Sequence, residues 1–308
     1  MLLFLILIIL CLIKPENTVE ITNQAIFLWA KNVLPTLLPF FIISKYMLNL
    51  GGERFFSKLF KPITTVLGLP NSSAFSIFIS IFCGFPLGSI IVENVYKSSK
   101  DKEYYANVCF SASSVFILAT VGSSILSSSA DGIALFVINL CTFFIFAVLT
   151  KPQYLSEQNF EIKKSEPISE SVSAIFNVCG NMILFLLISS LFTRFIKNKF
   201  LLALITGVFE FTSGIKMLSL FGSDTLPLIS FFISFGGLCV IFQCFGQLTS
   251  INKVKFILSR FFCGAISFLL CFLYKKTALI VPIIITVLVI TVCNLGRKRL
   301  YFLKSSRS

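Results

Sequence analysis

The chain has 308 residues, of which 56% are hydrophobic and 13% are charged, and its formal net charge is +13. Apolar runs of about 18 or more residues recur along it, which excludes an ordinary soluble domain and predicts an all-α polytopic membrane protein. Lys and Arg lie mainly in short loops and in the C-terminal tail, where they set membrane orientation. No basic stripe with interleaved aromatic residues indicates nucleic-acid binding, so we expect no nucleic-acid partner.

The ten cysteines fall mostly inside apolar segments, and the chain contains no histidine. Because no CxxC pair occurs, we expect the cysteines to be small apolar packing residues, with no disulfide, metal site or cofactor. Without histidine or paired acids in the apolar runs, no set of general acid and base groups is visible, so we do not expect an enzyme.

Three segments precede the first interrupted run. Met1–Ile13 is apolar but only about 20 Å long as a helix. It lacks a positive n-region and a small-residue cleavage site, so it predicts a short first span rather than a cleaved signal peptide. Ile26–Leu50 is the next predicted span. Gly51–Gly68 alternates aromatic and basic residues at helical spacing, which fits a short interfacial helix or a plain amphipathic connector.

The apolar run from Ala74 to Val92 contains the stretch Gly84-Phe-Pro-Leu-Gly-Ser89. Two glycines and a proline do not hold an unbroken helix. A broken backbone is tolerated in hydrocarbon only where protein or a water-filled cavity surrounds it. The stretch is therefore either a kinked spanning helix or a re-entrant turn that lines a site, and comparison with the rest of the chain favours the turn.

A second interruption lies in the spanning-length segment from Ala106 to Leu126. Four small residues, Ser111-Ala-Ser-Ser114, lie near its middle. Serines can pack helices closely or bond back to carbonyls. They equally fit an unwound segment that offers hydroxyls and amides to a solute.

The second half of the chain contains two more interrupted runs. Phe200–Phe221 is broken by Glu210-Phe-Thr-Ser-Gly214, and Leu226–Leu248 is broken by Gly236-Gly237. The basic tail predicts a cytoplasmic C-terminus, and Asp131-Gly132 is expected to cap the first of the remaining plain spans. These plain spans are Ile133–Leu149, Val172–Thr193, Phe256–Tyr274 and Leu279–Leu295.

The order of these features predicts an internal repeat. Asn32–Ser44 and Asn177–Ser189 match at five of thirteen positions. In each half a plain span is followed by two broken segments and another plain span, although glycines are also frequent in membrane helices generally. We expect one transmembrane domain, 1–308, divided into a first repeat at 26–150, a linker at 151–171, a second repeat at 172–274, and a last span with a basic tail at 279–308.

Interrupted segments in corresponding positions of two halves indicate the binding site of a secondary transporter. The amides at half-helix N-termini suit anionic groups, and Phe85, Phe116 or Phe242 could stack on a ring. The predicted substrate-binding residues are Gly84, Gly88, Ser89, Ser111, Ser113, Ser114, Glu210, Thr212, Ser213, Gly214, Gly236, Gly237 and Gln243.

Glu210 is the only acidic residue well inside an apolar run. A lone intramembrane carboxylate indicates function by default. It could bind a coupling cation, carry a proton or hydrogen-bond a solute. The alternatives are a structural pair with Lys216 and a position nearer the membrane interface.

Four motifs resemble those of the YlbJ-type sporulation integral membrane proteins, namely residues 32–44, 84–89, 111–117 and 207–216. The resemblance runs from about residue 26 to 275. The chain departs from it at Ser113-Ser114, where an Asn-Pro pair would be usual. That family carries a nucleoside-recognition gate domain and is similar in architecture to concentrative nucleoside transporters.

The resemblance implies two inverted repeats, each with a re-entrant hairpin and a broken helix. Hairpin tips would lie at Gly84–Ser89 and Glu210–Gly214, and the unwound parts of the broken helices at Ser111–Ser114 and Gly236–Leu238. It further implies a multi-pass protein of the cell membrane, specifically the outer forespore membrane.

The implied function is secondary transport of a small anionic or heteroaromatic solute, with dipicolinate moving from the mother cell toward the forespore. Na⁺ or H⁺ would be the coupling ion. The alternatives are a non-transporting assembly or gate component and a nucleoside transporter. Homo-oligomerisation is left open.

Overall fold

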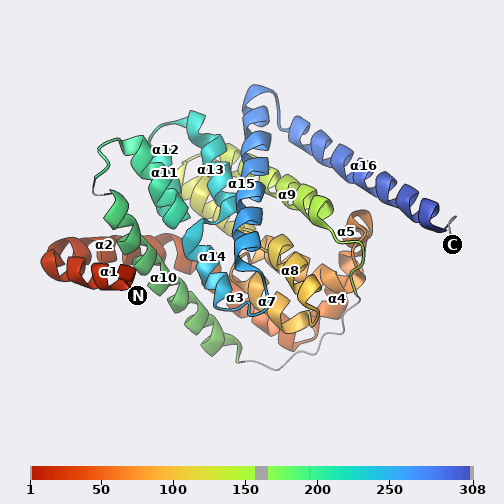
Figure 1. Cartoon of the computed structure of the whole chain (residues 1–308), viewed down its shortest axis with the longest axis horizontal. Helices are drawn as coiled ribbons and strands as arrows, with labels where there is room; N and C mark the ends of the chain where they lie inside the picture. The colour runs from red at the N-terminus through yellow and green to blue at the C-terminus, as the bar shows by residue number, and fades with distance from the viewer. Residues whose placement is uncertain (1, 157–165, 194, 306–308) are drawn as a thin grey trace.

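The computed structural model describes residues 2–156, 166–193 and 195–305, and in these ranges the chain forms helices and no strands (Figure 1). It is a polytopic all-α fold, as the composition predicts. Of the linker predicted at 151–171, residues 157–165 lie outside the described residues. Six described segments are long and apolar enough to cross a membrane: Pro15–Asn49, Ser129–Thr150, Pro167–Phe192, Ser223–Gln247, Lys253–Lys276 and Ile280–Arg297.

The N-terminal helices differ from the sequence prediction in where the first long span begins. Helix α1 covers Leu2–Ile13, and α2 begins at Pro15 and ends at Leu28. Proline suits the first turn of a helix because its missing N–H has no intrahelical partner there. The chain continues through the π-helical turn η1 (Trp29–Val33) into α3 (Leu34–Asn49), so the span predicted to start at Ile26 starts at Pro15.

The amphipathic stretch Gly51–Gly68 forms two short helices rather than one. Helix α4 covers Gly52–Leu59 and α5 covers Lys61–Leu67, with Pro62 in its first turn. The chain then bends by 118° into the segment Asn71–Phe82, which contains the 3₁₀ turn η2 (Asn71–Ser73). Phe56 of α4 stacks on Phe78, with ring centroids 4.1 Å apart, so the short helices are packed onto the bundle.

Each of the four predicted interruptions is a break between two helices. Residues 83–86 separate α6 (Ala74–Phe82) from α7 (Leu87–Val95), and a non-helical stretch at 110–113 separates α8 (Ser99–Val108) from the π-helix η3 (Phe116–Ile125). Single residues make the other two breaks. Glu210 separates α11 (Lys199–Phe209) from α12 (Phe211–Ser219), and Gly236 separates α13 (Leu226–Phe235) from α14 (Gly237–Phe245). The re-entrant course of the hairpins stays a prediction.

Long helices surround these broken segments, and α16 lies at the edge of the bundle (Figure 1). The cap predicted for α9 was wrong: the hydroxyl oxygen of Ser128, not Asp131-Gly132, caps the helix by accepting from the amide of Asp131 at 3.2 Å. The helix begins at Ser129, before the predicted start, so Asp131 lies inside its first turn and Ser128 occupies the cap position. The remaining elements are α9 (Ser129–Thr150), α10 (Pro167–Thr193), η4 (Ser223–Thr225), α15 (Lys253–Lys276) and α16 (Ile280–Ser305).

Small residues allow the helix backbones to approach each other closely. A Cβ added at Gly214 of α12 would lie 2.2 Å from the Cα of Gly207 in α11. Gly122 of η3 and Gly132 of α9 meet in the same way, with a Cβ at Gly122 lying 2.6 Å from the other Cα. In a membrane the hydrophobic effect provides little driving force for helices to associate, and close packing at such glycines stabilises the association instead.

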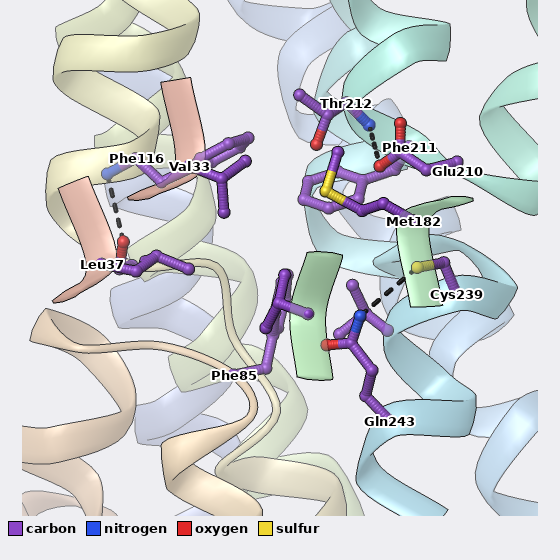
Figure 2. Close-up of a pocket in the computed structure, with 13 residues that line it drawn as sticks. Val33, Leu37, Phe85, Phe116, Met182, Glu210, Phe211, Thr212, Cys239 and Gln243 are labelled. Atoms are coloured by element: carbon purple, nitrogen blue, oxygen red, sulfur yellow. Dashed lines mark hydrogen bonds between the residues drawn. The ribbon is translucent and has the colours of Figure 1, made fainter. Parts of the chain in front are cut away.

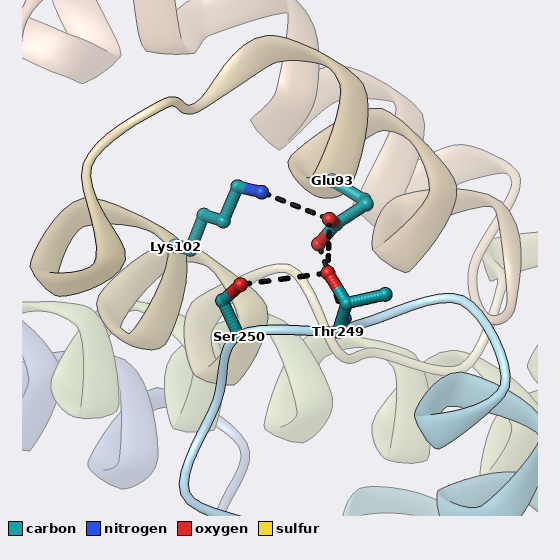
Figure 3. A network of polar contacts seen from close by, with 4 residues as sticks. All are labelled: Glu93, Lys102, Thr249 and Ser250. Carbon is teal, nitrogen blue, oxygen red and sulfur yellow. Dashed lines mark hydrogen bonds and ion pairs between the residues drawn. The ribbon is translucent and has the colours of Figure 1, made fainter.

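Polar contacts tie the first half of the chain to the second. The indole N–H of Trp29 donates to the carbonyl of Ile175 in α10 at 3.1 Å, and Lys45 of α3 forms an ion pair with Glu170. Figure 3 shows a third link, in which the carboxylate of Glu93 on α7 accepts from the Thr249 hydroxyl at 2.6 Å and from Lys102 at 2.8 Å. The segment after α14 is thereby held against the end of α7.

The Glu93 link predicts acid sensitivity. Burial raises the pKa of the Glu93 carboxyl, but the hydrogen bonds from Lys102 and Thr249 outweigh it and hold the pKa below its usual value. Because the pKa of Glu93 is lower in the folded state, its ionised carboxylate stabilises the fold at pH values above the unfolded-state pKa. This stabilisation is lost as the pH falls through the folded-state pKa. The thermal unfolding midpoint of wild type should therefore fall toward that of Glu93→Gln as the pH drops from about 5 to about 3.

Glu103→Gln provides the matched control for this measurement. The ion pair of Glu103 with Lys255 is long, at 3.7 Å, and solvent-exposed, so it contributes little stability. The difference between wild type and Glu103→Gln should be small at every pH. A gap between wild type and Glu93→Gln that stays constant over this range would contradict the assignment.

Candidate functional site

The four helix breaks meet at one place in the bundle. The amide of Phe85 donates to the carbonyl of Ser111 at 2.9 Å, which joins the first break to the second. A Cβ added at Gly236 would lie 2.6 Å from the ring of Phe110, and one at Gly237 would lie 3.1 Å from the amide nitrogen of Phe211. The fourth break is therefore in contact with the second and third. Non-helical backbone at this depth is surrounded by protein, as a bilayer requires.

A small pocket lies at this meeting point (Figure 2). The residues that line it are Val33, Leu37, Phe85, Ser113, Phe116, Val178, Met182, Glu210, Phe211, Thr212, Cys239, Val240 and Gln243.

The pocket is nearly closed in this conformation. The room left for the centres of water-sized molecules is about 30 Å³, and one water needs about 10–15 Å³ of such room. The space holds a few waters, and a larger solute requires its walls to move apart.

Both halves of the chain contribute matching positions to the pocket. Val33 and Leu37 come from the segment Asn32–Ser44, and Val178 and Met182 occupy the equivalent places in Asn177–Ser189. In each half these residues are followed by lining residues from the two breaks. This arrangement is the one expected of the predicted repeat, which stays a prediction.

Three phenyl rings form the aromatic part of the pocket wall. Phe211 lies 5.6 Å from Phe85 and 5.3 Å from Phe116, measured between ring centroids. All three side chains are buried. Such rings offer faces and edges to a planar aromatic solute at separations of about 4.5–7 Å. Phe242, the third ring predicted to stack on a solute, is 51% exposed and lies outside the pocket.

Glu210 is the single charged residue among the described residues that line the pocket, and its side chain is buried. One carboxylate oxygen accepts from the amide of Thr212 at 3.0 Å (Figure 2). The other accepts from the amide of Ser213 at 2.7 Å. The carboxylate thus caps α12, where the helix dipole favours a negative charge. No described ion pair joins Glu210 to Lys216.

This cap leaves the carboxylate chemically available. An ionised carboxyl has about four acceptor positions, and the two backbone amides use two of them. The remaining positions can accept from a solute donor or bind a cation. The amides of Thr212 and Ser213, which were predicted to hold an anionic solute, already bond to the chain's own carboxylate.

Neutral polar groups complete the pocket. The Ser113 hydroxyl oxygen accepts from the amide of Phe116 at 3.1 Å, at the start of the helical segment that leads into η3. The side-chain amide of Gln243 donates to the sulfur of Cys239 at 3.3 Å, which leaves its carbonyl oxygen as an acceptor at the pocket wall. Thr212 adds a hydroxyl group.

Of the thirteen predicted site residues, four line the pocket: Ser113, Glu210, Thr212 and Gln243. The others form the backbone around it or lie behind it. Gly84 and Gly88 pack against the second break, where an added Cβ would lie 2.4 Å from the amide nitrogen of Ser113 and 2.3 Å from the carbonyl oxygen of Cys109, respectively. Ser111 faces a different cavity. The rest, Ser89, Ser114, Ser213, Gly214, Gly236 and Gly237, are not among the lining residues.

The structure adds apolar lining residues that the sequence prediction did not name. Phe211, Cys239 and Val240 lie within one to four residues of predicted positions. Val33, Leu37, Val178 and Met182 lie inside the two segments compared for the repeat. Their equivalent spacing in those segments was the one signal that could have identified them.

Comparisons with known proteins agree with the motifs. A family model described as nucleoside recognition, Gate, matches residues 30–158. The chain is 24% identical over 324 aligned residues to the "Sporulation integral membrane protein YlbJ" of Bacillus subtilis (strain 168), which covers 85% of this chain and 78% of that protein. No solved structure matches significantly. This multi-pass chain is thus similar over most of its length to a sporulation integral membrane protein, and residues 30–158 match the gate domain.

Proposed function

We propose that the chain is a secondary transporter that carries a small heteroaromatic solute through the pocket at its four helix breaks. The name of the YlbJ relative supports a role in sporulation, and dipicolinate moving from the mother cell toward the forespore is the solute we propose. The protein would act in the outer forespore membrane, with a cytoplasmic C-terminus, and would perform no enzymatic reaction.

The observation that carries this proposal is the composition of the pocket. Three phenyl rings stand beside one carboxylate, one amide and two hydroxyl-bearing residues at the meeting point of four breaks. A largely apolar pocket with few converging polar groups is typical of small-molecule sites. Broken helices at matching positions of two halves are typical of transporter sites.

The buried carboxylate of Glu210 constrains how a dianion such as dipicolinate would bind. Like charges in a desolvated site repel strongly. We therefore propose that a Na⁺ ion or a proton enters with the solute and balances the charge beside Glu210. Coupling to a cation gradient follows from that requirement.

Transport by purified protein in liposomes tests the proposal. Labelled dipicolinate should enter in a saturable manner when a Na⁺ or H⁺ gradient is imposed, and entry should collapse with the ionophore for the coupling ion. Protein-free liposomes and liposomes with Gly51→Ala, which changes a glycine outside the pocket, are the controls. If no labelled solute moves under either gradient, a non-transporting assembly or gate component is the better account.

A nucleoside is the second candidate solute, and one observation favours it. A neutral nucleoside places a ring among the phenyl groups without adding negative charge beside Glu210, and the matched gate domain is described as nucleoside recognition. Competition between labelled dipicolinate and unlabelled uridine separates the two. Uptake of uridine alone would replace dipicolinate as the solute and keep the transport assignment.

A further inference from the structure

Arg260 carries a buried positive charge without a carboxylate partner. It lies in α15, its side chain is 1% exposed, and none of the described ion pairs includes it. Uncompensated ions in low-dielectric surroundings are costly. The charge therefore needs a counter-charge or a dense shell of acceptors.

The contacts of Arg260 satisfy part of its guanidinium group. Nη1 donates to the carbonyl of Phe110 at 3.0 Å. The guanidinium carbon lies 4.8 Å from the ring centroid of Phe146 and 5.5 Å from that of Phe256, close enough for cation–π attraction. Nη2 is buried and has no hydrogen-bond partner among the described residues. Two N–H donors on one nitrogen are left without an acceptor.

A second pocket lies at this guanidinium, separate from the one at the four breaks. The backbone at 110–113 divides the two, because Ser113 lines the first pocket whereas Phe110 and Ser111 line the second. None of the second pocket's lining residues is acidic. They are Asn107, Val108, Phe110, Ser111, Asn139, Thr142, Phe143, Phe146, Ser234, Arg260 and Cys263.

The polar groups around this second pocket include further donors. The side-chain amide of Asn139 donates to Ser111 Oγ at 3.0 Å, and that of Asn107 donates to the carbonyl of Glu103 at 2.7 Å. Each amide nitrogen has a second N–H. The acceptor oxygen of Asn139 is already bonded to Ser234 at 3.3 Å. The pocket therefore offers a surplus of donors beside a cation.

We propose that this second pocket is a binding site for a small monovalent anion, a halide such as chloride, held by Arg260 Nη2 and the amides of Asn139 and Asn107. The room for the centre of a water-sized particle is about 10 Å³, the lower limit for one water; this excludes an aromatic solute, and a halide, which is somewhat larger than water, requires the lining side chains to move slightly. The anion neutralises Arg260 and stabilises the break at 110–113. This site goes beyond the proposed transport function and does not depend on it.

Thermal unfolding in defined anions tests the site. Purified protein is measured in gluconate and then in mixtures of gluconate and chloride at constant ionic strength. Because a ligand that binds only the folded state stabilises it, wild type should show a saturable rise of the midpoint by about 2–4 °C. Bromide should act in the same way, and sulfate, which carries two charges and is larger, should not.

Two variants locate the response. Arg260→Met removes the charge and should abolish the chloride response. Asn139→Asp supplies a carboxylate beside the guanidinium, so it should raise the midpoint in gluconate above that of wild type and also abolish the response. Arg297→Met is the control, because Arg297 also has a buried unpaired nitrogen but lies outside this pocket; it should respond to chloride as wild type does.

The outcomes divide cleanly. A wild type without a saturable chloride response shows that the pocket holds only water and overturns the proposal. A response that persists in Arg260→Met or Asn139→Asp also overturns it, because the anion then binds elsewhere. If Arg260→Met fails to fold, Asn139→Asp alone decides the question.

Discussion

Gly84→Ala should abolish transport and lower stability well beyond the ordinary cost of an alanine at positive φ. Gly84 has φ +72°, and a Cβ there would lie 2.4 Å from the amide nitrogen of Ser113. The left-handed conformation alone costs an L-residue about 1–2 kcal/mol. The clash adds about 1–3 kcal/mol because backbone, not a flexible side chain, must move. That movement displaces Ser113 from the pocket wall.

Gly51→Ala is the matched control for this substitution. Gly51 has φ +74°, but its added Cβ would meet only the Glu53 carboxylate at an ordinary 3.7 Å. It should incur the conformational cost without the clash and leave transport near wild type. Thermal unfolding and liposome uptake measure both effects. Equal behaviour of the two variants would show that close packing of the first two breaks is unimportant for transport.

The same geometry predicts that a larger residue at Gly88 blocks transport. A Cβ at Gly88 would already lie 2.3 Å from the carbonyl oxygen of Cys109, so alanine is large enough to disturb the contact. Gly88→Ala should therefore resemble Gly84→Ala, although its backbone requires no positive φ.

The helix breaks were predictable because they depend on local chemistry. Gly84, Pro86 and Gly236 disfavour a continuous helix whatever surrounds them, and the backbone at each is non-helical or left-handed. That the four breaks lie close together in space could be predicted only from the expected internal repeat. Their contacts, such as Phe85 with Ser111, depend on tertiary packing that no local pattern contains.

The apolar half of the pocket could not be singled out in this way. Val33, Leu37, Val178 and Met182 resemble any residue on a packed helix face, and only their matching places in two segments distinguish them. Aromatic residues are equally ambiguous. Phe116 faces the pocket and Phe242 faces away from it, although both lie in interrupted runs.

Arg260 shows a different limit of sequence reasoning. It lies eight residues into α15, close to Lys253 and Lys255, so it looks like part of a basic helix end that reaches the membrane interface. The structure instead turns its side chain into the bundle, against Phe110 and Phe146. Which face of a helix points inward near its end depends on the neighbouring helices, and the local charge pattern does not reveal it.

Glu210→Gln should reduce gradient-driven transport by at least about tenfold, with a loss of stability of only about 1–2 kcal/mol. Glutamine keeps the length of the side chain, but it replaces one of the two oxygens that now accept from these amides by an NH₂ donor, so the cap is weakened. The larger effect follows from charge. Without the carboxylate, the described lining of the pocket has no negative charge to attract a Na⁺ ion or a proton beside the solute.

In Glu210→Gln, an effect of lost stability on transport must be separated from an effect of lost charge. A variant of another helix cap, which loses stability but no charge in the pocket, allows this. Asn198 caps α11 by accepting from the amides of Phe200 and Leu201 at 2.9 and 3.1 Å, and it lies outside the pocket. Asn198→Ala removes two cap bonds, a loss at least as large as that in Glu210→Gln, and should lower the free energy of unfolding by at least as much while transport stays near wild type. Glu210→Asp keeps the charge and should retain part of the activity. If Glu210→Gln transported as well as Asn198→Ala, the carboxylate would be a helix cap and nothing more, and the coupling cation would have to bind to the neutral oxygens of Ser113, Thr212 and Gln243.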